Sequence, residues 1–417
     1  MTDVLVLGSG GREHAVVHAL NKSSKVGRVY CAPGNAGIAK EAECVNIGVM
    51  QFEDIAQFLL SHPNITLTVA TPDNPLVDGI VDYLTERGHR TFGPQKAAAL
   101  IEGSKLFAKR LMKENGIPTA DYEFFDDYTL ALEYIKKAAY PLVVKADGLA
   151  FGKGVIICSD YLQAQKALTS IMCDATFGKS NRSVVIEQFL VGREVTLLAF
   201  TDGKTVSLMP SAQDHKRAGD GDTGLNTGGM GAFSPSPYFT KELLEKTKEK
   251  IVYPTIKALN NCNRTFKGVL YFGLMICNGK PYVIEYNARF GDPETQAILP
   301  LLNSDLYDIL NSVVDENLSE VKIEWRAGQA VSVVLASEGY PGAYATGSKI
   351  EIIDTPQVEI YHAGTKQVGD SIVTSGGRVL AVTAVDINME KAREKVYGAI
   401  KNISFDGMFY RNDIGIK

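Results

Sequence analysis

The first 95 residues alternate between short apolar runs and segments whose apolar positions have helical spacing. The expected strands are 3–7, 28–31 and 66–70, and the expected helices are 13–21 and 51–61. Such alternation is typical of a parallel sheet covered by helices. Ser104 is a favourable N-cap residue, so we expect another helix to begin there.

The pattern becomes mixed after residue 140. The expected strands are 142–146, 154–157, 183–187, 194–201, 205–209, 267–276 and 281–287, and the expected helices are 160–172 and about 239–261. The polar, glycine-rich segment 213–231 is the only long irregular stretch, which favours a functional loop. Strands expected at 329–336 and 378–385 and a helix at 389–402 indicate a separate C-terminal domain.

Composition narrows the class of protein. A chain of 417 residues with 45 % hydrophobic and 22 % charged residues is typical of a globular protein with two to four domains. A net charge of −5 argues against nucleic-acid and membrane partners. The first residues resemble a strand and not a signal peptide, and the six cysteines are scattered without a C-x-x-C pair. We therefore expect a cytoplasmic protein.

Two glycine-rich turns are candidate phosphate sites. Gly8, Gly10 and Gly11 follow a strand and open a helix, but Glu13 occupies the third glycine position of a dinucleotide fingerprint, so NAD binding is weakly supported. The alternatives are a tight strand-to-helix turn and a helix N-terminus that offers its amides to a phosphate.

The second turn lies within "VVKADGLAFGKGV", residues 143–155. Its glycines do not have P-loop spacing, because Gly148 and Gly152 are one residue too close and Gly154 replaces the metal-binding hydroxyl. A plain hairpin turn would explain the glycines. Lys145 favours a phosphate grip, since an unpaired ammonium at the end of an apolar strand is costly.

Acidic residues on strands suggest the rest of a nucleotide site. Glu285 and Asn287 are two apart on an apolar strand, so they share a face, and Arg289 extends that face. Their oxygen atoms suit Mg²⁺ beside substrate phosphates. Glu187 and Glu194 are either solvated glutamates or ligands for adenine and ribose.

The segment 211–235 combines several charged residues with a Gly-Gly-Met-Gly turn. Its charged residues include Asp214, His215 and Lys216. A solvated surface loop is one interpretation. The length of the segment and its mixture of charges with glycines favour a loop that handles a substrate.

These residues together resemble the ATP-grasp superfamily and, within it, the phosphoribosylamine–glycine ligase family. The motifs that carry the resemblance are "GSGGREHA" (8–15), "PGNAG" (33–37), "QDHKR" (213–217), "NTGGMGA" (226–232), "NARFGDPETQ" (287–296), "HAGT" (362–365), "SGGRVL" (375–380) and "FYRNDIG" (409–415). They are spread from the beginning to the end of the chain, so the resemblance covers all of it.

The resemblance implies a fold of α/β and α+β units. A Rossmann-like N-terminal domain would span 1–103, an ATP-grasp domain 104–325 with a mobile lid subdomain at about 118–190, and a small C-terminal domain 326–417. It also implies ATP-dependent ligation of glycine to 5-phosphoribosylamine in de novo purine biosynthesis. The products would be glycinamide ribonucleotide, ADP and phosphate, with glycyl phosphate as the intermediate. We expect a monomer.

The resemblance assigns roles to single residues. For ATP these are Lys105, Lys145, Gly148, Gly152 and Gly154 at the phosphates, Glu187 at the adenine amino edge and Glu194 at the ribose. Mg²⁺ or Mn²⁺ would bind Glu285 and Asn287. We expect Asp214, Lys216 and Arg289 at glycine, with Asp214 and Arg289 as the catalytic candidates, and Gly8, Gly10, Gly11, Asp73, Lys366 and Arg378 at phosphoribosylamine.

Two positions depart from the family pattern. Asp73 stands where the family usually has a glutamate, which shortens a carboxylate that could contact the substrate ribose, and Phe151 replaces a small residue in the glycine loop. Two other classes stay open. One is a different ATP-grasp ligase or carboxylase that shares only the core, and the other is a nucleotide-binding regulator without turnover.

Overall fold

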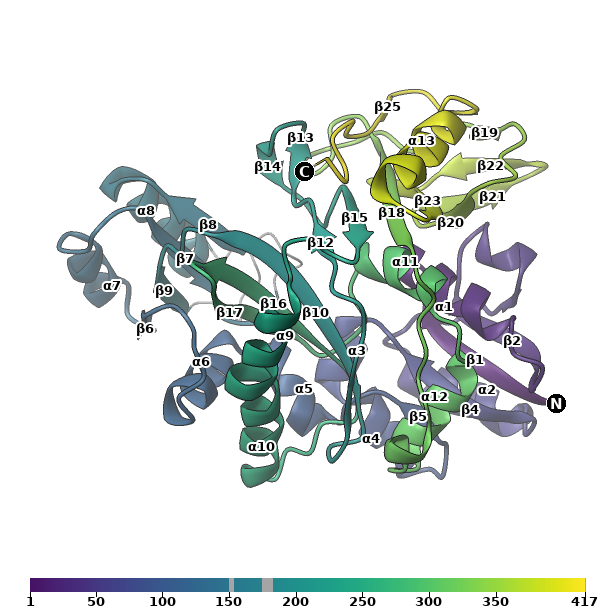
Figure 1. Cartoon of the computed structure of the whole chain (residues 1–417), viewed down its shortest axis with the longest axis horizontal. Coiled ribbons are helices and arrows are strands. Elements are labelled where there is room, and N and C mark those ends of the chain that lie inside the picture. The colour runs from purple at the N-terminus through teal and green to yellow at the C-terminus, as the bar shows by residue number, and fades with distance from the viewer. Residues whose placement is uncertain (150–153, 175–182, 417) are drawn as a thin grey trace.

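The computed structural model describes residues 1–149, 154–174 and 183–416. Within these ranges the chain forms an N-terminal α/β unit, a central antiparallel sheet, a smaller sheet at one end of the molecule and a C-terminal sheet (Figure 1). This combination confirms the predicted fold class. None of the helices described combines the length and apolar composition that crossing a bilayer requires.

The N-terminal unit is a parallel sheet of strand order β3-β2-β1-β4-β5. Its strands are β1 Thr2–Gly8, β2 Val26–Pro33, β3 Glu43–Cys44, β4 Ile65–Ala70 and β5 Thr91–Phe92. Its helices are α1 Gly11–Leu20, the 3₁₀ turn η1 Ile38–Lys40, α2 Phe52–Ser61, α3 Asp73–Asp78, α4 Ile80–Thr85 and α5 Lys96–Gly103. Strand β1 lies between β2 and β4 and is covered on both faces, which explains its continuous apolar run.

The smaller sheet is antiparallel and has the order β6-β9-β7-β8. Its strands are β6 Tyr122–Phe125, β7 Leu142–Ala146, β8 Val155–Cys158 and β9 Val184–Gln188. The helices α7 Tyr128–Ile135 and α8 Tyr161–Leu168, which continues as the π-helix η2 Thr169–Cys173, pack on it. Strands β7 and β8 are a hairpin, and Gly148 in their connection has φ of +105°.

The central sheet has the order β11-β10-β16-β17. Its strands are β10 Arg193–Thr201, β11 Val206–Leu208, β16 Gly268–Cys277 and β17 Lys280–Asn287. The surrounding helices are α6 Lys105–Glu114, α9 Lys241–Thr247, the π-helix η3 Lys248–Val252, α10 Tyr253–Asn261, α11 Glu294–Ile298 and α12 Leu306–Val314, with the 3₁₀ turns η4 Leu299–Leu301 and η5 Leu318–Glu320. Ser104 caps α6 by accepting the amide of Phe107, as predicted.

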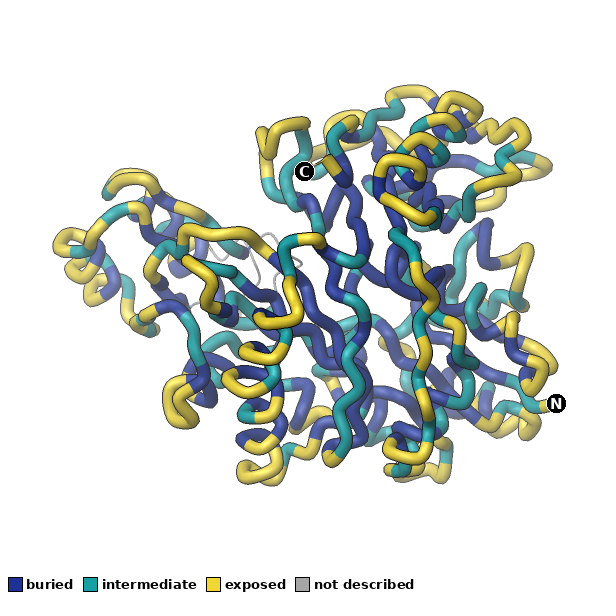
Figure 2. The backbone as a smooth tube through the Cα atoms, in the orientation of Figure 1, coloured by how far each residue is buried: buried dark blue, intermediate teal, exposed yellow. Residues whose placement is uncertain are grey.

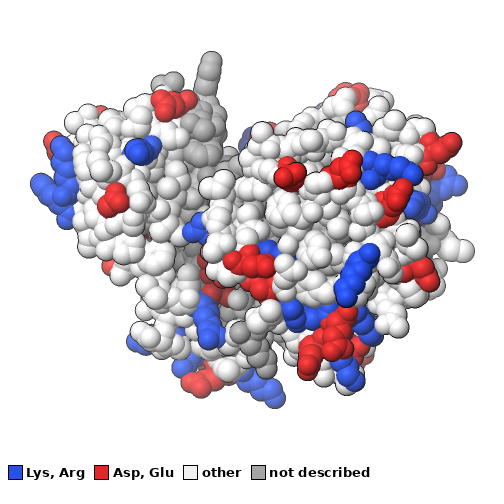
Figure 3. Space-filling view, turned by 90° about the horizontal axis from the view of Figure 1, so that it is seen from above, with Lys and Arg blue, Asp and Glu red and all other residues white. Residues whose placement is uncertain are grey.

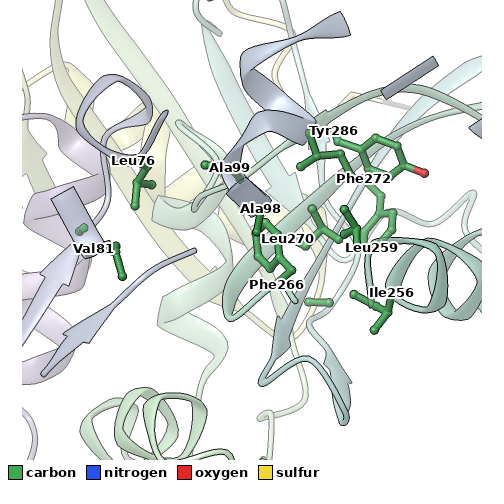
Figure 4. Packing of buried hydrophobic residues seen from close by; sticks show 14 of the residues in the cluster. Leu76, Val81, Ala98, Ala99, Ile256, Leu259, Phe266, Leu270, Phe272 and Tyr286 are labelled. Carbon is green, nitrogen blue, oxygen red and sulfur yellow. The ribbon is translucent and has the colours of Figure 1, made fainter. Parts of the chain in front are cut away.

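One hydrophobic cluster joins the N-terminal unit to the central sheet. Leu76 and Val81 of the N-terminal helices belong to the same cluster as Phe266, Leu270 and Phe272 beside or within the central sheet (Figure 4). Figure 2 shows the buried backbone continuing through the middle of the molecule. Each such side chain contributes about 1.5–3 kcal/mol when fully buried, so this cluster fixes the two units against each other.

The segment 213–231 is not the irregular loop that the sequence indicated. It contains β12 Gln213–Asp214, a hairpin of β13 Arg217–Gly219 and β14 Thr223–Asn226, and the beginning of β15 Gly231–Ser234. Short strands rich in glycine and charge have no apolar alternation, which is why the pattern missed them.

Strands β12 and β15 join the C-terminal sheet, whose order is β12-β15-β18-β23-β20 with β25 beside β18. The C-terminal elements are β18 Gln329–Ser337, β19 Glu351–Ile352, β20 Glu359–His362, β21 Thr365–Val368, β22 Ser371–Thr374, β23 Arg378–Asp386, α13 Met389–Ile400, β24 Ile403–Ser404 and β25 Met408–Phe409. The segment after β11 is thus hydrogen-bonded to strands more than 90 residues further along the chain.

The N-terminal and C-terminal units share a cluster of histidines and carboxylates. His18 of α1 lies 2.9 Å from Glu41 and 3.6 Å from Glu359 of β20, measured from ring nitrogen to carboxylate oxygen. The interactions with Glu359 and Glu41 raise the pKa of His18 to about 9. His18 therefore carries a positive charge at neutral pH and links β20 to α1.

We expect the charge on His18 to make this contact pH-dependent. The pKa of His18 is raised from 6.5 to about 9. The stabilisation of the fold by the charged His18 is therefore complete below pH 6.5 and is lost as pH rises through 9. The melting temperature of the wild type should therefore fall more steeply between these two values than that of His18→Gln. Parallel melting curves for the two proteins across this range would contradict the assignment.

Candidate active site

Two lysines from different elements converge on the glycine loop. Lys105, the first residue of α6, donates from its Nζ to the carbonyl of Gly148 at 2.8 Å. Lys145 of β7 is buried, and its Nζ donates to the carbonyl of Ile284 in β17 at 3.1 Å. The carbonyl of Gly154 accepts the amide of Ala146, which closes the described part of the loop. Gly152 and Phe151 lie outside the described residues.

Glu187 of β9 lies between two lysine ammonium groups. Its Oε1 is 2.9 Å from Nζ of Lys145, and its Oε2 is 3.0 Å from Nζ of Lys109 on α6. All three side chains are almost completely buried. Both oxygens of Glu187 are therefore paired with lysines. This carboxylate balances the buried positive charge of Lys109 and Lys145 beside the predicted phosphate site.

Sequence reasoning missed Lys109. Its Nζ also donates to Oγ1 of Thr119 at 2.7 Å, and that hydroxyl donates to the carbonyl of Val283. Burial lowers the pKa of Lys109 to about 8, and Glu187 acts in the opposite direction. The available signal was spacing, since Lys109 follows Lys105 by four residues and so lies on the same face of the helix.

The predicted metal ligands lie at the end of β17 within a group of cations. Nζ of Lys216 is 3.4 Å from Oε1 of Glu285 and 3.5 Å from Oε2 of Glu194. Lys216, followed by Lys145 and Lys105, lowers the pKa of Glu285 to about 2, so its carboxylate is ionised. The amide oxygen of Asn287 accepts Nη2 of Arg289 at 3.2 Å. An ionised carboxylate and an amide oxygen on one strand are suitable donors for Mg²⁺.

Arg289 connects this group to the N-terminal unit. Its Nη2 lies 3.4 Å from Oε1 of Glu102 in α5, and Oε2 of Glu102 accepts the amide of Ala288. Burial raises the pKa of Glu102 to about 6, and Arg289 opposes that change. Asp73, at the beginning of α3, also contributes to the electrostatic environment of Arg289, and its Oδ1 accepts the amide of Asn74.

Asp214 of β12 is an acid of the site whose hydrogen-bonding capacity is only partly used. Its Oδ1 is buried and has no hydrogen-bond partner among the described residues. Burial, followed by the nearby Glu294, raises the pKa of Asp214. Glu294 itself accepts hydrogen bonds from the hydroxyls of Thr196 and Tyr271. A buried carboxylate without a partner is costly, and a cationic ligand group would compensate it.

The N-terminal glycine turn is occupied by a side chain of the protein itself. Glu13 accepts the amide of Gly10 at 2.6 Å and the hydroxyl of Thr71 at 2.7 Å. A Cβ atom at Gly8 would lie 2.4 Å from Cγ of Glu13, and φ of Gly8 is +126°. The amide of Gly10 is thus bonded within the protein, and the assignment of Gly8, Gly10 and Gly11 to phosphoribosylamine stays a prediction.

The two basic residues predicted in the C-terminal unit have different surroundings. Nη2 of Arg378 binds Oδ2 of Asp292 at 2.8 Å, and its Nη1 donates to the carbonyls of Gly228 and Asp292. Arg378 therefore joins three segments of the chain. Lys366 is exposed on β21, next to Thr365, whose carbonyl accepts the amide of Ala36. This places Lys366 near the "PGNAG" loop.

The fold, together with a match to an ATP-grasp domain over residues 103–295 and highly similar ligases, identifies the chain as an ATP-grasp ligase. The structure of a biotin carboxylase–β,γ-ATP complex from Campylobacter jejuni superposes with a TM-score of 0.74 at 15 % identity, covering 100 % of this chain and 94 % of the other, so the two share a fold. Models of phosphoribosylglycinamide synthetase match residues 2–102 (N domain), 103–295 (ATP-grasp domain) and 330–417 (C domain). The chain belongs to the phosphoribosylglycinamide synthetase family, which confirms the predicted family.

Individual relatives agree with this assignment. A phosphoribosylamine–glycine ligase from Caldanaerobacter subterraneus subsp. tengcongensis is 47 % identical over 412 residues, covering 99 % of both chains. The trifunctional purine biosynthetic protein adenosine-3 of Gallus gallus is 46 % identical over 421 residues, which cover 99 % of this chain and 42 % of that protein. The crystal structure of a phosphoribosylamine–glycine ligase from Thermotoga maritima has a TM-score of 0.85 at 35 % identity, covering 99 % of this chain and 100 % of the other.

We expect Lys109→Met to lower the free energy of unfolding by about 3 kcal/mol, because it leaves the buried carboxylate of Glu187 with one ammonium partner. Lys113→Met is the matched control, since Lys113 is exposed one turn further along α6. It should change the free energy by about 0.5 kcal/mol or less. Urea unfolding measures both values, and equal effects would contradict the role of Lys109.

Proposed function

We propose that this chain joins glycine to 5-phosphoribosylamine with ATP and releases glycinamide ribonucleotide, ADP and phosphate through glycyl phosphate. Membership of the family and relatives that carry the ligase name over the whole chain support the reaction. The convergence of Lys105, Lys145 and Lys216 around Glu285 supports the location of this reaction. The phosphates of a nucleoside triphosphate require positive charges nearby, and its metal ion requires a negatively charged ligand.

The phosphoryl transfer follows from the chemistry of the substrates. A carboxylate resists attack by an amine, so a glycine carboxylate oxygen first attacks the γ-phosphorus of ATP, and the bond from that phosphorus to the β-phosphate oxygen breaks. Lys105 and Lys145 would neutralise the phosphate oxygens during this step. Mg²⁺ or Mn²⁺ held by Glu285 and Asn287 would supply further charge neutralisation. The half-exposed Glu194 would bind the ribose hydroxyls.

Glycine would be held between the central sheet and the segment after β11. Asp214 has a buried oxygen without a partner among the described residues, so it is the acceptor that we assign to the glycine ammonium. Arg289 and Lys216 would hold the glycine carboxylate. The amine of phosphoribosylamine then attacks the carbonyl carbon of glycyl phosphate, the bond between that carbon and the phosphate oxygen breaks, and the nitrogen releases one proton.

The remaining residues would contact adenine, the ATP phosphates and phosphoribosylamine. Glu187 would contact the adenine amino edge while its carboxylate stays paired with Lys109 and Lys145. Gly148, Gly152 and Gly154 would cover the ATP phosphates. Phosphoribosylamine would lie near Gly8, Gly11, Asp73 and Lys366, with Gly10 and Arg378 shaping that site through the contacts that already hold them.

The proposed domain boundaries stay 1–103, 104–325 with a lid at about 118–190, and 326–417. Strands β12 and β15 belong to the C-terminal sheet although they precede residue 326. We further propose a cytoplasmic monomer that acts on small molecules. Lysines and arginines are interspersed with acids on the face seen in Figure 3, which supports the expectation of no nucleic-acid partner.

We expect Glu285→Gln to lower kcat/KM by at least about a hundredfold, because the amide loses the charge that a divalent ion requires. Asn287→Asp is the control, since it keeps an oxygen donor and should retain most activity. ADP release that depends on both glycine and phosphoribosylamine measures each variant. Wild-type activity in Glu285→Gln would refute the assignment of the metal ligand.

Isotope transfer tests the intermediate. With glycine labelled by ¹⁸O in its carboxylate, one labelled oxygen should appear in the released phosphate, because the oxygen that attacks phosphorus leaves with it. Mass spectrometry of the phosphate measures this directly. Phosphate without label in a reaction that forms glycinamide ribonucleotide would exclude glycyl phosphate.

A further inference from the structure

Arg411 is a completely buried arginine that lies outside the proposed site. Its side chain is 1 % exposed and is the largest fully buried side chain among the described residues. Burying a guanidinium is costly unless its donors are satisfied. Its Nε and Nη2 donate to the two carboxylate oxygens of Asp413 at 2.7 and 2.6 Å. This bidentate pair is local, two residues apart, and fixes the orientation of the guanidinium.

The remaining contacts of Arg411 reach a distant part of the chain. Its Nη1 donates to Oδ1 of Asp222 at 2.8 Å and to the carbonyl of Arg217 at 3.1 Å. Asp222 lies in the turn of the β13–β14 hairpin, and Arg217 is the first residue of β13. One guanidinium therefore binds the first residue of β13 and the turn that follows this strand, almost 200 residues earlier in the chain. Figure 1 shows this hairpin beside the end of the chain.

Neighbouring residues strengthen the same connection. The amide and Nδ2 of Asn412 donate to the carboxylate of Asp220 at 2.7 and 3.0 Å, and the amide of Gly221 donates to Oδ2 of Asp413 at 2.9 Å. The turn of the hairpin is thus held from one side by residues 411–413. Within the hairpin itself, Gly219 pairs with Thr223 and Arg217 with Asn226, so the connection extends to its base.

The base of the hairpin lies directly beside the proposed substrate groups. Arg411 binds the carbonyl of Arg217, the residue directly after Lys216. The carbonyl of Lys216 accepts both the amide and the hydroxyl of Thr227, at 2.7 and 2.9 Å. Asp214 lies two residues before Lys216, in β12. A displacement of β13 would therefore move the ammonium of Lys216 relative to Glu285, and the carboxylate of Asp214 with it.

We propose that Arg411 is a positioning residue for the ligation: through the β13–β14 hairpin it holds Lys216 and Asp214 in the orientation that glycine requires. The inference rests on the proposed function, because that function places glycine at these two residues. A purely structural role for Arg411 would stabilise the C-terminal unit without any selective effect on glycine.

The chain provides a matched control for these two roles. Arg393 of α13 binds the same segment, since its Nη2 donates to the carbonyl of Asn412 at 3.0 Å and its Nη1 to the carbonyl of Ile414. It makes these contacts from the side of α13 and not from the hairpin. Arg393→Met therefore weakens the attachment of residues 412–414 and leaves the pairing of Arg411 with Asp222 and Arg217 in place.

The test compares the full-length variants Arg411→Met, Arg411→Lys, Asp222→Asn and Arg393→Met. Arg411→Met should raise KM for glycine by at least about tenfold and lower kcat, since small displacements of positioning groups have large kinetic effects. KM for ATP should change less, because Lys105 and Lys145 lie on other elements. Asp222→Asn should also raise KM for glycine. Arg411→Lys should recover part of the activity that Arg411→Met loses. Arg393→Met should keep KM for glycine within about twofold of the wild-type value.

Hydrogen–deuterium exchange without substrates provides a readout independent of activity. Amides of residues 217–226 should exchange faster in Arg411→Met and Asp222→Asn than in the wild type or Arg393→Met. Unchanged exchange there, or an unchanged KM for glycine in folded Asp222→Asn and Arg411→Met, would overturn the proposal. A failure of the proposed function itself would appear separately, as wild-type ADP release that does not require glycine.

Discussion

The site depends on the compensation of buried positive charge. Lys109 and Lys145 come from a helix and from the smaller sheet, and one carboxylate, Glu187, satisfies both. Because an uncompensated ammonium cannot remain charged in the interior at acceptable cost, α6, β7 and β9 must pack in one arrangement. This charge pairing, with the hydrogen bond from Lys145 to the carbonyl of Ile284 in β17, thus also holds the smaller sheet against the central one.

The same principle operates on the other side of the site. Lys216 comes from the segment after β11, and burial alone would disfavour its charge, but Glu285 and Glu194 outweigh burial and raise the pKa of Lys216. The segment that carries Lys216 pairs with the C-terminal sheet through β12 and β15. The C-terminal unit is therefore part of the proposed active site, because its strands hydrogen-bond the segment that carries Lys216.

The N-terminal turn shows how a resemblance to one motif can hide a different use of glycine. In a dinucleotide site the glycines make room for a phosphate. Here Gly8 makes room for the side chain of Glu13, whose carboxylate binds the amide of Gly10. The residue that weakened the NAD interpretation from sequence is the one that occupies the turn in the structure.

The sequence by itself determined the local elements and the identity of the family. Apolar spacing located β1, β4 and β17 to within one or two residues, and Ser104 marked the beginning of α6, since both signals depend on neighbouring positions. Only the tertiary structure decided that Glu187 lies between two lysines, that 213–234 contributes strands to the C-terminal sheet, and that Arg411 reaches Asp222. These contacts join segments that lie tens to almost 200 residues apart, and hydrogen bonding and charge pairing over such separations leave no periodic signal along the chain.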